Sequence, residues 1–342
     1  DGCSGEIIQK GAVTTFDYEF HAYSSAINNC FGLRGCDNLL DRITEDRSAK
    51  LYNNNFPLSC NVTAREAIEK GQVVNRSQIY DINSVSFDDQ FTDCNPNDKE
   101  KVVWIFRHNY SFGLYFDLTG ELDAKLASEE MGQLYRYVAY ADVYYSLSSN
   151  SMEELISYGW FPFIEIIDSD FKHLAALISE GKVEHVQAWT DKVFTSERIN
   201  KIVGRWWLRP AFNGKKEIVE QAIACYHRED YAACISTLVP LVEGIANEDS
   251  VIKTTKGIAY RDKDVVGYIS GAASGKHHKN SLAMPVEFLK YLTTHFYKHS
   301  TSSTSNSSTR HATSHGRATV DSFGKQQAVQ AILLLDQIRY YL

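Results

Sequence analysis

The residues DYAACISTLVPLVEGIA, numbered 230–246, and the residues FGKQQAVQAILLLDQIRYYL, numbered 323–342, decide the fold. In both stretches apolar side chains recur at helical spacing: Tyr231, Cys234, Leu238, Leu241, Val242 and Ile245 in the first, and Ala328, Ala331, Ile332, Leu335 and Ile338 in the second. Each stretch therefore predicts a helix with one apolar face, and the two together predict a bundle. Pro240 should kink or interrupt the first helix, and Asp321 or Ser322 should cap the second.

The stretch RHATSHGR, residues 310–317, lies between these helices, directly after a run of only Ser, Thr and Asn at residues 300–309. It gathers two guanidinium and two imidazole groups: Arg310, His311, His315 and Arg317. An imidazole titrates near neutral pH and acts as a base or an acid. A guanidinium stays charged, and its planar fork fits phosphate oxygens. These are the groups that cleavage of an RNA strand needs when no metal ion takes part.

The order of Arg310, His311, His315 and Gly316 resembles the signature of the HEPN superfamily (higher eukaryotes and prokaryotes nucleotide-binding). The helix predicted over residues 230–246, with its LVEGI ending, is similar to the helix that precedes this signature in bacterial members. Together with the closing helix, the resemblance covers about residues 195–342.

The resemblance implies a metal-independent endoribonuclease of the bacterial defence or toxin type, whose products carry 2′,3′-cyclic phosphate and 5′-hydroxyl ends. Arg310 would stabilise the scissile phosphate, His315 would be the acid and base, and His311 would position them. We expect RNA as the substrate, an antitoxin or other defence partner, and a homodimer or higher homo-oligomer formed through the C-terminal domain. No metal and no cofactor are expected. The alternative is a non-catalytic HEPN module for nucleotide or RNA binding or for oligomeric assembly.

Charge is distributed unevenly along the chain. The net charge is −8, yet residues 251–342 carry twelve Lys and Arg against five Asp and Glu. A basic end on an acidic body indicates an anionic partner for the C-terminal part, with an ordinary dipolar surface as the alternative. We predict substrate contacts from Arg317, Lys276, Lys279 and Glu243. Glu243 would be either a carboxylate that orients the Arg/His cluster or a solvated capping residue.

The whole chain is predicted to be mainly α, in three parts. Residues 1–120 form a small mixed α+β region of unknown role, with a hairpin over 102–116 and a short helix over 64–70. Residues 121–210 form a helical middle region. Residues 211–342 form the HEPN-like helical domain, in which 251–280 is a polar connection between helices.

Five of the seven cysteines lie in the first 94 residues: Cys3, Cys30, Cys36, Cys60 and Cys94. A secreted disulfide domain and a zinc site are both alternatives, but no Cys-x2-Cys pair is present. We favour reduced, mostly buried thiols. No apolar run approaches the ~18 residues of a membrane span, and no signal-peptide pattern opens the chain. These features favour a cytoplasmic protein.

Overall fold

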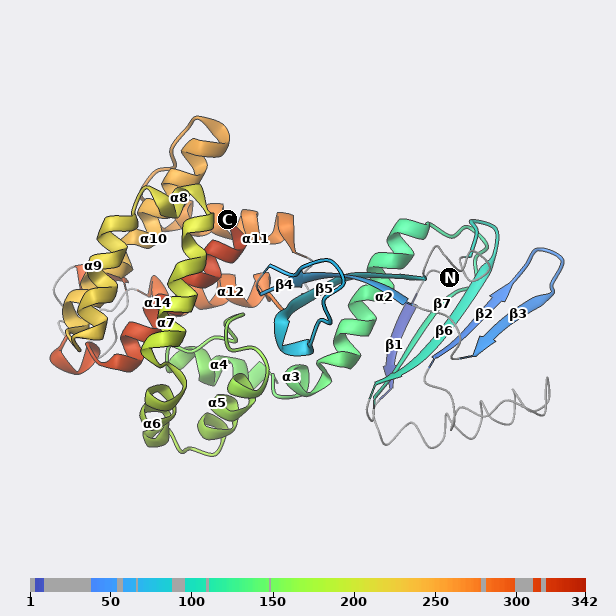
Figure 1. The fold of residues 1–342 in the computed structure, drawn as a ribbon, viewed down its shortest axis with the longest axis horizontal. Helices are drawn as coiled ribbons and strands as arrows, with labels where there is room; N and C mark the ends of the chain where they lie inside the picture. Colours follow the sequence, from blue (N-terminus) through green and yellow to red (C-terminus); the bar gives the residue numbers. More distant parts are fainter. Residues whose placement is uncertain are drawn as a thin grey trace. The chain divides into compact units, whose positions relative to one another are not determined.

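The computed structural model describes residues 4–8, 38–53, 58–65, 67–87, 96–108, 111–147, 149–277, 281–298, 310–314 and 318–342. Contacts between residues divide the chain into two compact units, the first ending at Tyr144 and the second running from Tyr145 to Leu342. The first unit holds strands and one long helix, and the regular elements described in the second are all helices (Figure 1). The predicted boundaries lie near residues 120 and 210, whereas the contacts divide the chain once, after Tyr144. None of the helices described is both long enough and apolar enough to cross a bilayer.

The first unit contains a five-stranded antiparallel sheet in the order β1-β7-β6-β2-β3. Its strands are β1 (Ser4–Ile8), β2 (Asn38–Ile43), β3 (Ala49–Asn53), β6 (Lys101–His108) and β7 (Ser111–Asp117). The predicted hairpin is confirmed as β6 and β7, with Phe106 paired to Gly113. Phe106 stacks on Trp104 with ring centroids 4.2 Å apart. Gly113 leaves room for the Phe106 ring, because a Cβ at Gly113 would lie 2.1 Å from it.

A second, two-stranded sheet pairs β4 (Leu58–Ala64) with β5 (Ile79–Phe87), and the short 3₁₀ helix η2 (Arg76–Gln78) leads into β5. The helix predicted over residues 64–70 is wrong. Val62 and Thr63 pair with Ile82 and Asp81 instead, so the ladder with a distant strand overrides a local capping signal.

Helix α2 (Ala124–Ala139) packs against β5, and α3 (Ala141–Tyr145) follows after a break at Tyr140. Asp123 caps α2 by accepting hydrogen bonds from two backbone amides, each at 3.0 Å. A Cβ at Gly132 would lie 2.4 Å from the Ser84 Cα, so the absence of a side chain lets helix and strand touch. The carboxylate of Asp81 pairs with the Arg136 guanidinium at 3.1 Å, and both side chains are buried.

The second unit is a bundle of helices connected by short turns and longer loops. The helices are α4 (Ser149–Ser157), α5 (Ser169–Ser179), α6 (Glu184–Val193), α7 (Ser196–Gly204), η4 (Arg205–Leu208), α8 (Pro210–Asn213), α9 (Lys216–His227), α10 (Tyr231–Thr254), α11 (Asp262–Lys276), α12 (Pro285–Tyr291), the π-helical η5 (Leu292–Phe296), α13 (Arg310–Ser314), η6 (Val320–Ser322) and α14 (Lys325–Tyr341). The mainly helical class is thereby confirmed, together with the small sheet region near the N-terminus.

Helix α14 is the centre of this bundle, and every residue from Ala328 to Tyr341 is buried. The predicted apolar stripe is confirmed, but the opposite face is buried as well, because α6, α10 and α11 pack around the helix. The predicted cap is wrong. Gly324 occupies the cap position without a side-chain hydrogen bond, and Asp321 and Ser322 lie in η6.

Helices α10 and α11 depart from the prediction in length. Asp230 caps α10, and the helix continues past Pro240 to Thr254, so the proline does not end it. Residues 251–280 are not a polar connection, because α11 occupies 262–276. Val265, Ile269 and Ala273 form its buried face four residues apart. Three exposed glycines of α11 obscured the helical pattern: Gly267, Gly271 and Gly275.

Candidate functional site

The guanidinium of Arg310 is held by the carboxylate of Glu243. Arg310 begins the short helix α13, and Glu243 lies in the middle of α10, against which α13 packs. Nε donates to Oε1 at 2.6 Å, and Nη2 donates to Oε2 at 3.2 Å. The Glu243 side chain is 10% exposed and that of Arg310 19% exposed. The pair therefore fixes the direction of the guanidinium while one side of it stays open to solvent.

Glu243 does more than neutralise Arg310. Its hydrogen bonds raise the pKa of Arg310, against the effect of burial, and the charge of Asp262 adds to this. The nearby Tyr297 is buried, and both its burial and the Glu243 charge raise the pKa of its hydroxyl. Arg310 is therefore a cation and Tyr297 a neutral phenol near neutral pH.

The structure brings two of the predicted site residues together, Arg310 and Glu243. His311 lies in α13, but its side chain is outside the described residues, as are His315, Arg317 and Lys279. Ala312, between the two predicted histidines, is buried against the bundle, and its carbonyl accepts a hydrogen bond from the Ala318 amide at 3.1 Å. That contact anchors the segment that carries Arg310.

Lys276 is not part of the Arg310 site. It is the last residue of α11, whereas Asp262, whose charge acts on Arg310, is the first. At 1.5 Å per residue these two ends are ~20 Å apart. The Lys276 ammonium donates instead to the backbone carbonyls of Tyr340 and Tyr341, at 3.2 and 3.5 Å.

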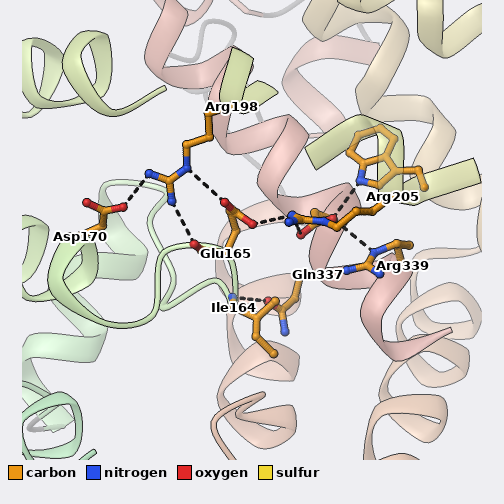
Figure 2. Close-up of polar contacts among 9 residues, drawn as sticks. Ile164, Glu165, Asp170, Arg198, Arg205, Gln337 and Arg339 are labelled. Atoms are coloured by element: carbon orange, nitrogen blue, oxygen red, sulfur yellow. Dashed lines mark hydrogen bonds and ion pairs between the residues drawn. The ribbon is translucent and has the colours of Figure 1, made fainter. Parts of the chain in front are cut away.

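A second polar cluster, which the sequence did not predict, lies inside the bundle and is drawn in Figure 2. The Glu165 carboxylate lies between two cations and accepts from Arg198 Nε at 3.1 Å and from Arg205 Nη2. Arg198 also donates to Asp170 at 2.6 Å. We call the six charged residues of this cluster the buried network, after its fully buried member Asp336, although Arg198 and Asp170 at its edge are 24% and 32% exposed: Glu165, Asp170, Arg198, Arg205, Asp336 and Arg339.

Asp336 closes the buried network on the other side. It is fully buried, accepts from the Trp206 indole at 3.0 Å, and pairs with Arg205 and Arg339 at 3.3 Å each. Burial raises the pKa of its carboxyl, while the two cations oppose that shift. Asp336 directly after the apolar run Ala331–Leu335 was the signal in the sequence, since an ionised group is buried only with partners.

The buried network and the Arg310 pair differ in what they leave available. The network has three cations and three carboxylates, each in contact with another, which is the balance expected of a structural element.

Among the described residues, no group of His, Cys, Asp and Glu is arranged to hold a metal ion. The described cysteines are not paired in disulfides: Cys60 is exposed, Cys225 is half-buried and Cys234 is buried. Comparison with protein families, with curated proteins and with solved structures found no match to this chain.

Proposed function

We propose that the helical unit is a HEPN-type endoribonuclease that cleaves RNA without a metal ion. The observation that carries the proposal is the two-point contact between Arg310 and Glu243. It uses Nε and Nη2 of the guanidinium. The third nitrogen, Nη1, has no hydrogen bond to any part of the chain that the structure describes. A fixed cation with one free donor suits a phosphoryl oxygen on which negative charge develops.

The reaction needs a base, an acid and this cation. A base takes the proton of a ribose 2′-hydroxyl, the 2′-oxygen bonds to the adjacent phosphorus, and the bond from phosphorus to the 5′-oxygen breaks. An acid gives the leaving 5′-oxygen a proton, so the products are a 2′,3′-cyclic phosphate and a 5′-hydroxyl. We assign acid–base catalysis to His315, its positioning to His311, and charge stabilisation to Arg310. Arg317 and Lys279 are proposed to contact neighbouring phosphates.

One imidazole per chain is a weak catalyst, since acid or base assistance contributes roughly 10²- to 10⁴-fold. We therefore propose a homodimer through the helical unit, in which two copies of residues 310–317 face one cleft and supply an acid and a base at once. A toxin or antiviral defence role, with an antitoxin as partner, follows from the same resemblance.

The second candidate is a non-catalytic HEPN module, and the charge of Glu243 favours it. A carboxylate bound to Arg310 already neutralises it, which lowers the attraction of the pair for an anion. Such a module would bind RNA or nucleotides, or assemble oligomers, without cleaving the strand.

RNA incubated with the protein in excess EDTA separates the two candidates. The wild type is expected to cut a labelled single strand to 2′,3′-cyclic phosphate and 5′-hydroxyl ends, and His315→Ala to lose at least 100-fold in rate. His185→Ala is the matched control, because His185 is 62% exposed and lies in α6. Binding of RNA without cleavage, unchanged in His315→Ala, would establish the non-catalytic module instead.

A further inference from the structure

A cluster of cations lies where the C-terminal end of α14 meets α10, α11 and the start of α8. It is made of Arg209, Lys253, Lys276 and Arg339, which we call the cation cluster. Figure 1 marks this end of α14 with the letter C, and α14 contacts both α10 and α11. The four residues come from separate elements of the helical unit, so no single sequence segment reveals the cluster.

Three consecutive backbone carbonyls hold the two lysines together. Lys276 donates to the carbonyls of Tyr340 and Tyr341, and Lys253 donates to that of Leu342 at 3.1 Å. Because neighbouring residues are 3.8 Å apart along the chain, the two ammonium groups lie on the order of 10 Å apart or less. Lys276 is exposed, and the Lys253 side chain is 48% exposed, so an anion in solvent can reach both.

The two arginines add positive charge to the cluster, because the charges of both act on Lys276. Arg209 is half-buried, and its side chain forms no hydrogen bond or ion pair within the described part of the chain. Arg339 is 9% exposed, and its Nη2 is a buried donor to which the described residues offer no acceptor. Because this donor is enclosed by protein atoms, Arg339 contributes positive charge to the cluster and not a direct contact to a ligand.

Local negative charge does not balance these cations. Asp336 of the buried network compensates Arg339, which leaves Arg209, Lys253 and Lys276. Two sources of negative charge lie near them. One is the carboxylate of Asp249, which pairs with Lys253 at 2.8 Å, and the other is the C-terminal end of α14. A helix C-terminus carries about half a negative charge, so roughly one and a half positive charges remain. Capping α14 accounts for the lysine contacts but not for this excess.

We propose that the cation cluster is a binding site for a phosphate group, in which Arg209 and the two lysines contact its oxygens and Arg339 adds positive charge. The site lies at the opposite end of α11 from Arg310, and it does not depend on the proposed nuclease activity.

The pKa shifts of Lys276 and Arg209 show that the cations of the cluster act on one another. Burial and the neighbouring cations Arg209, Lys253 and Arg339 lower the pKa of Lys276 to about 8, and Asp249 only partly offsets this. Burial and the Arg339 charge lower the pKa of Arg209 in the same way. A phosphate dianion would remove this mutual repulsion.

Calorimetric titration with inorganic phosphate, and separately with pyrophosphate, tests the proposal at pH 7.5 and constant ionic strength. For this test three neutral residues are added after Leu342, so that no terminal carboxylate competes with phosphate for the cations. Wild type is expected to bind at one site, and Arg209→Gln and Lys276→Gln are expected to weaken binding roughly tenfold or more each. Because the Arg209 side chain makes no hydrogen bond within the described chain, its substitution is expected to leave the fold intact. Lys182→Gln and Arg228→Gln remove the same charge from exposed positions and are the controls.

The same variants are also titrated with a short single-stranded RNA, at a low temperature at which cleavage is too slow to interfere. This second titration identifies the source of the phosphate. Weakening of inorganic phosphate binding by Arg209→Gln supports a small-molecule site, and weakening of RNA binding alone supports a backbone phosphate at the same residues. Absence of binding by every anion overturns the proposal. Equal weakening by the control substitutions does so too, because it would mean that only overall charge matters.

Discussion

The buried network and the Arg310–Glu243 pair are both built from Arg and acidic side chains, yet they differ in how many charged partners each member has and in how far the cluster is exposed to solvent. Network members bridge one another within the bundle, and Asp336 is shielded from water completely. The Arg310–Glu243 pair has two members, and the Arg310 side chain is 19% exposed. The network joins α14 to α7 and to the loop before α5, whereas the pair only joins a short helix to α10.

This difference gives a way to separate structural from functional charges. A buried charge that has all its partners is expensive to disturb, because removing one partner strands the others away from water. The Arg310–Glu243 pair is mostly buried, but it has only two members and the Arg310 side chain is 19% exposed, so water can replace part of a lost partner and the cost should be smaller. Substitutions in the network should therefore act on stability, and substitutions in the pair on function.

The largest effect is expected for Asp336→Ala. It removes the acceptor of the Trp206 indole and leaves Arg205 and Arg339 without their shared carboxylate, so the free energy of unfolding should fall by about 3–5 kcal/mol. Urea denaturation followed by circular dichroism measures this. Asp321→Ala, at an exposed position of η6, should change it by less than about 0.5 kcal/mol. A loss below about 1 kcal/mol for Asp336→Ala would show that the network is not structural.

A smaller stability effect and a clear functional one are expected for Glu243→Gln. The amide keeps one acceptor for Arg310, whose exposed side can gain water, so the free energy of unfolding should fall by about 1 kcal/mol or less. RNA cleavage should slow roughly tenfold through kcat, with KM nearly unchanged, because the guanidinium loses its fixed direction. Glu220→Gln, at an exposed position of α9, is the control. A change in KM alone would mean that Glu243 does not position Arg310 for catalysis.

The smallest effect is a dependence of stability on pH that comes from Lys276. Its pKa is lowered from 10.5 to about 8 in the folded protein, so the charged form destabilises the fold. Below pH 8 both folded and unfolded chains carry the proton, and the full cost is present. Between about pH 8 and 10.5 the folded chain has released it and the unfolded chain has not. Stability of the wild type relative to Lys276→Met should therefore rise across that window.

Urea denaturation of both proteins at pH 7, 8.5 and 10, in buffers free of phosphate, measures this difference. A difference between the two proteins that stays constant with pH would show that the cations around Lys276 do not act on it.

The elements that the sequence predicted are those whose pattern is local. The apolar stripe of α14 and the alternating strands around residues 102–116 carry their own periodicity, so each is visible in a short window. Contacts between distant segments were invisible. Thr63 joins a strand because of Asp81 and its neighbours, and α11 was missed because its glycines dilute a buried face that only packing reveals.

The candidate site shows the same limit. Arg310 and Glu243 stood out by their residue types and by the resemblance, and they meet although 67 residues separate them. Lys276 was predicted to join them on the basis of its charge alone, but it lies at the C-terminal end of α11, away from Arg310. Arg205 and Asp336 lie 131 residues apart, and neither sequence segment predicts a contact with the other.

RNA cleavage and the free energy of unfolding, measured on one preparation of Arg310→Ala beside the wild type in EDTA, test the central claim most directly. Arg310 is expected to be dispensable for folding and essential for strand scission. The variant should lose at least 100-fold in cleavage rate, while its free energy of unfolding falls by less than about 2 kcal/mol. Undiminished cleavage by the variant, or a wild type that leaves RNA intact, would contradict the claim.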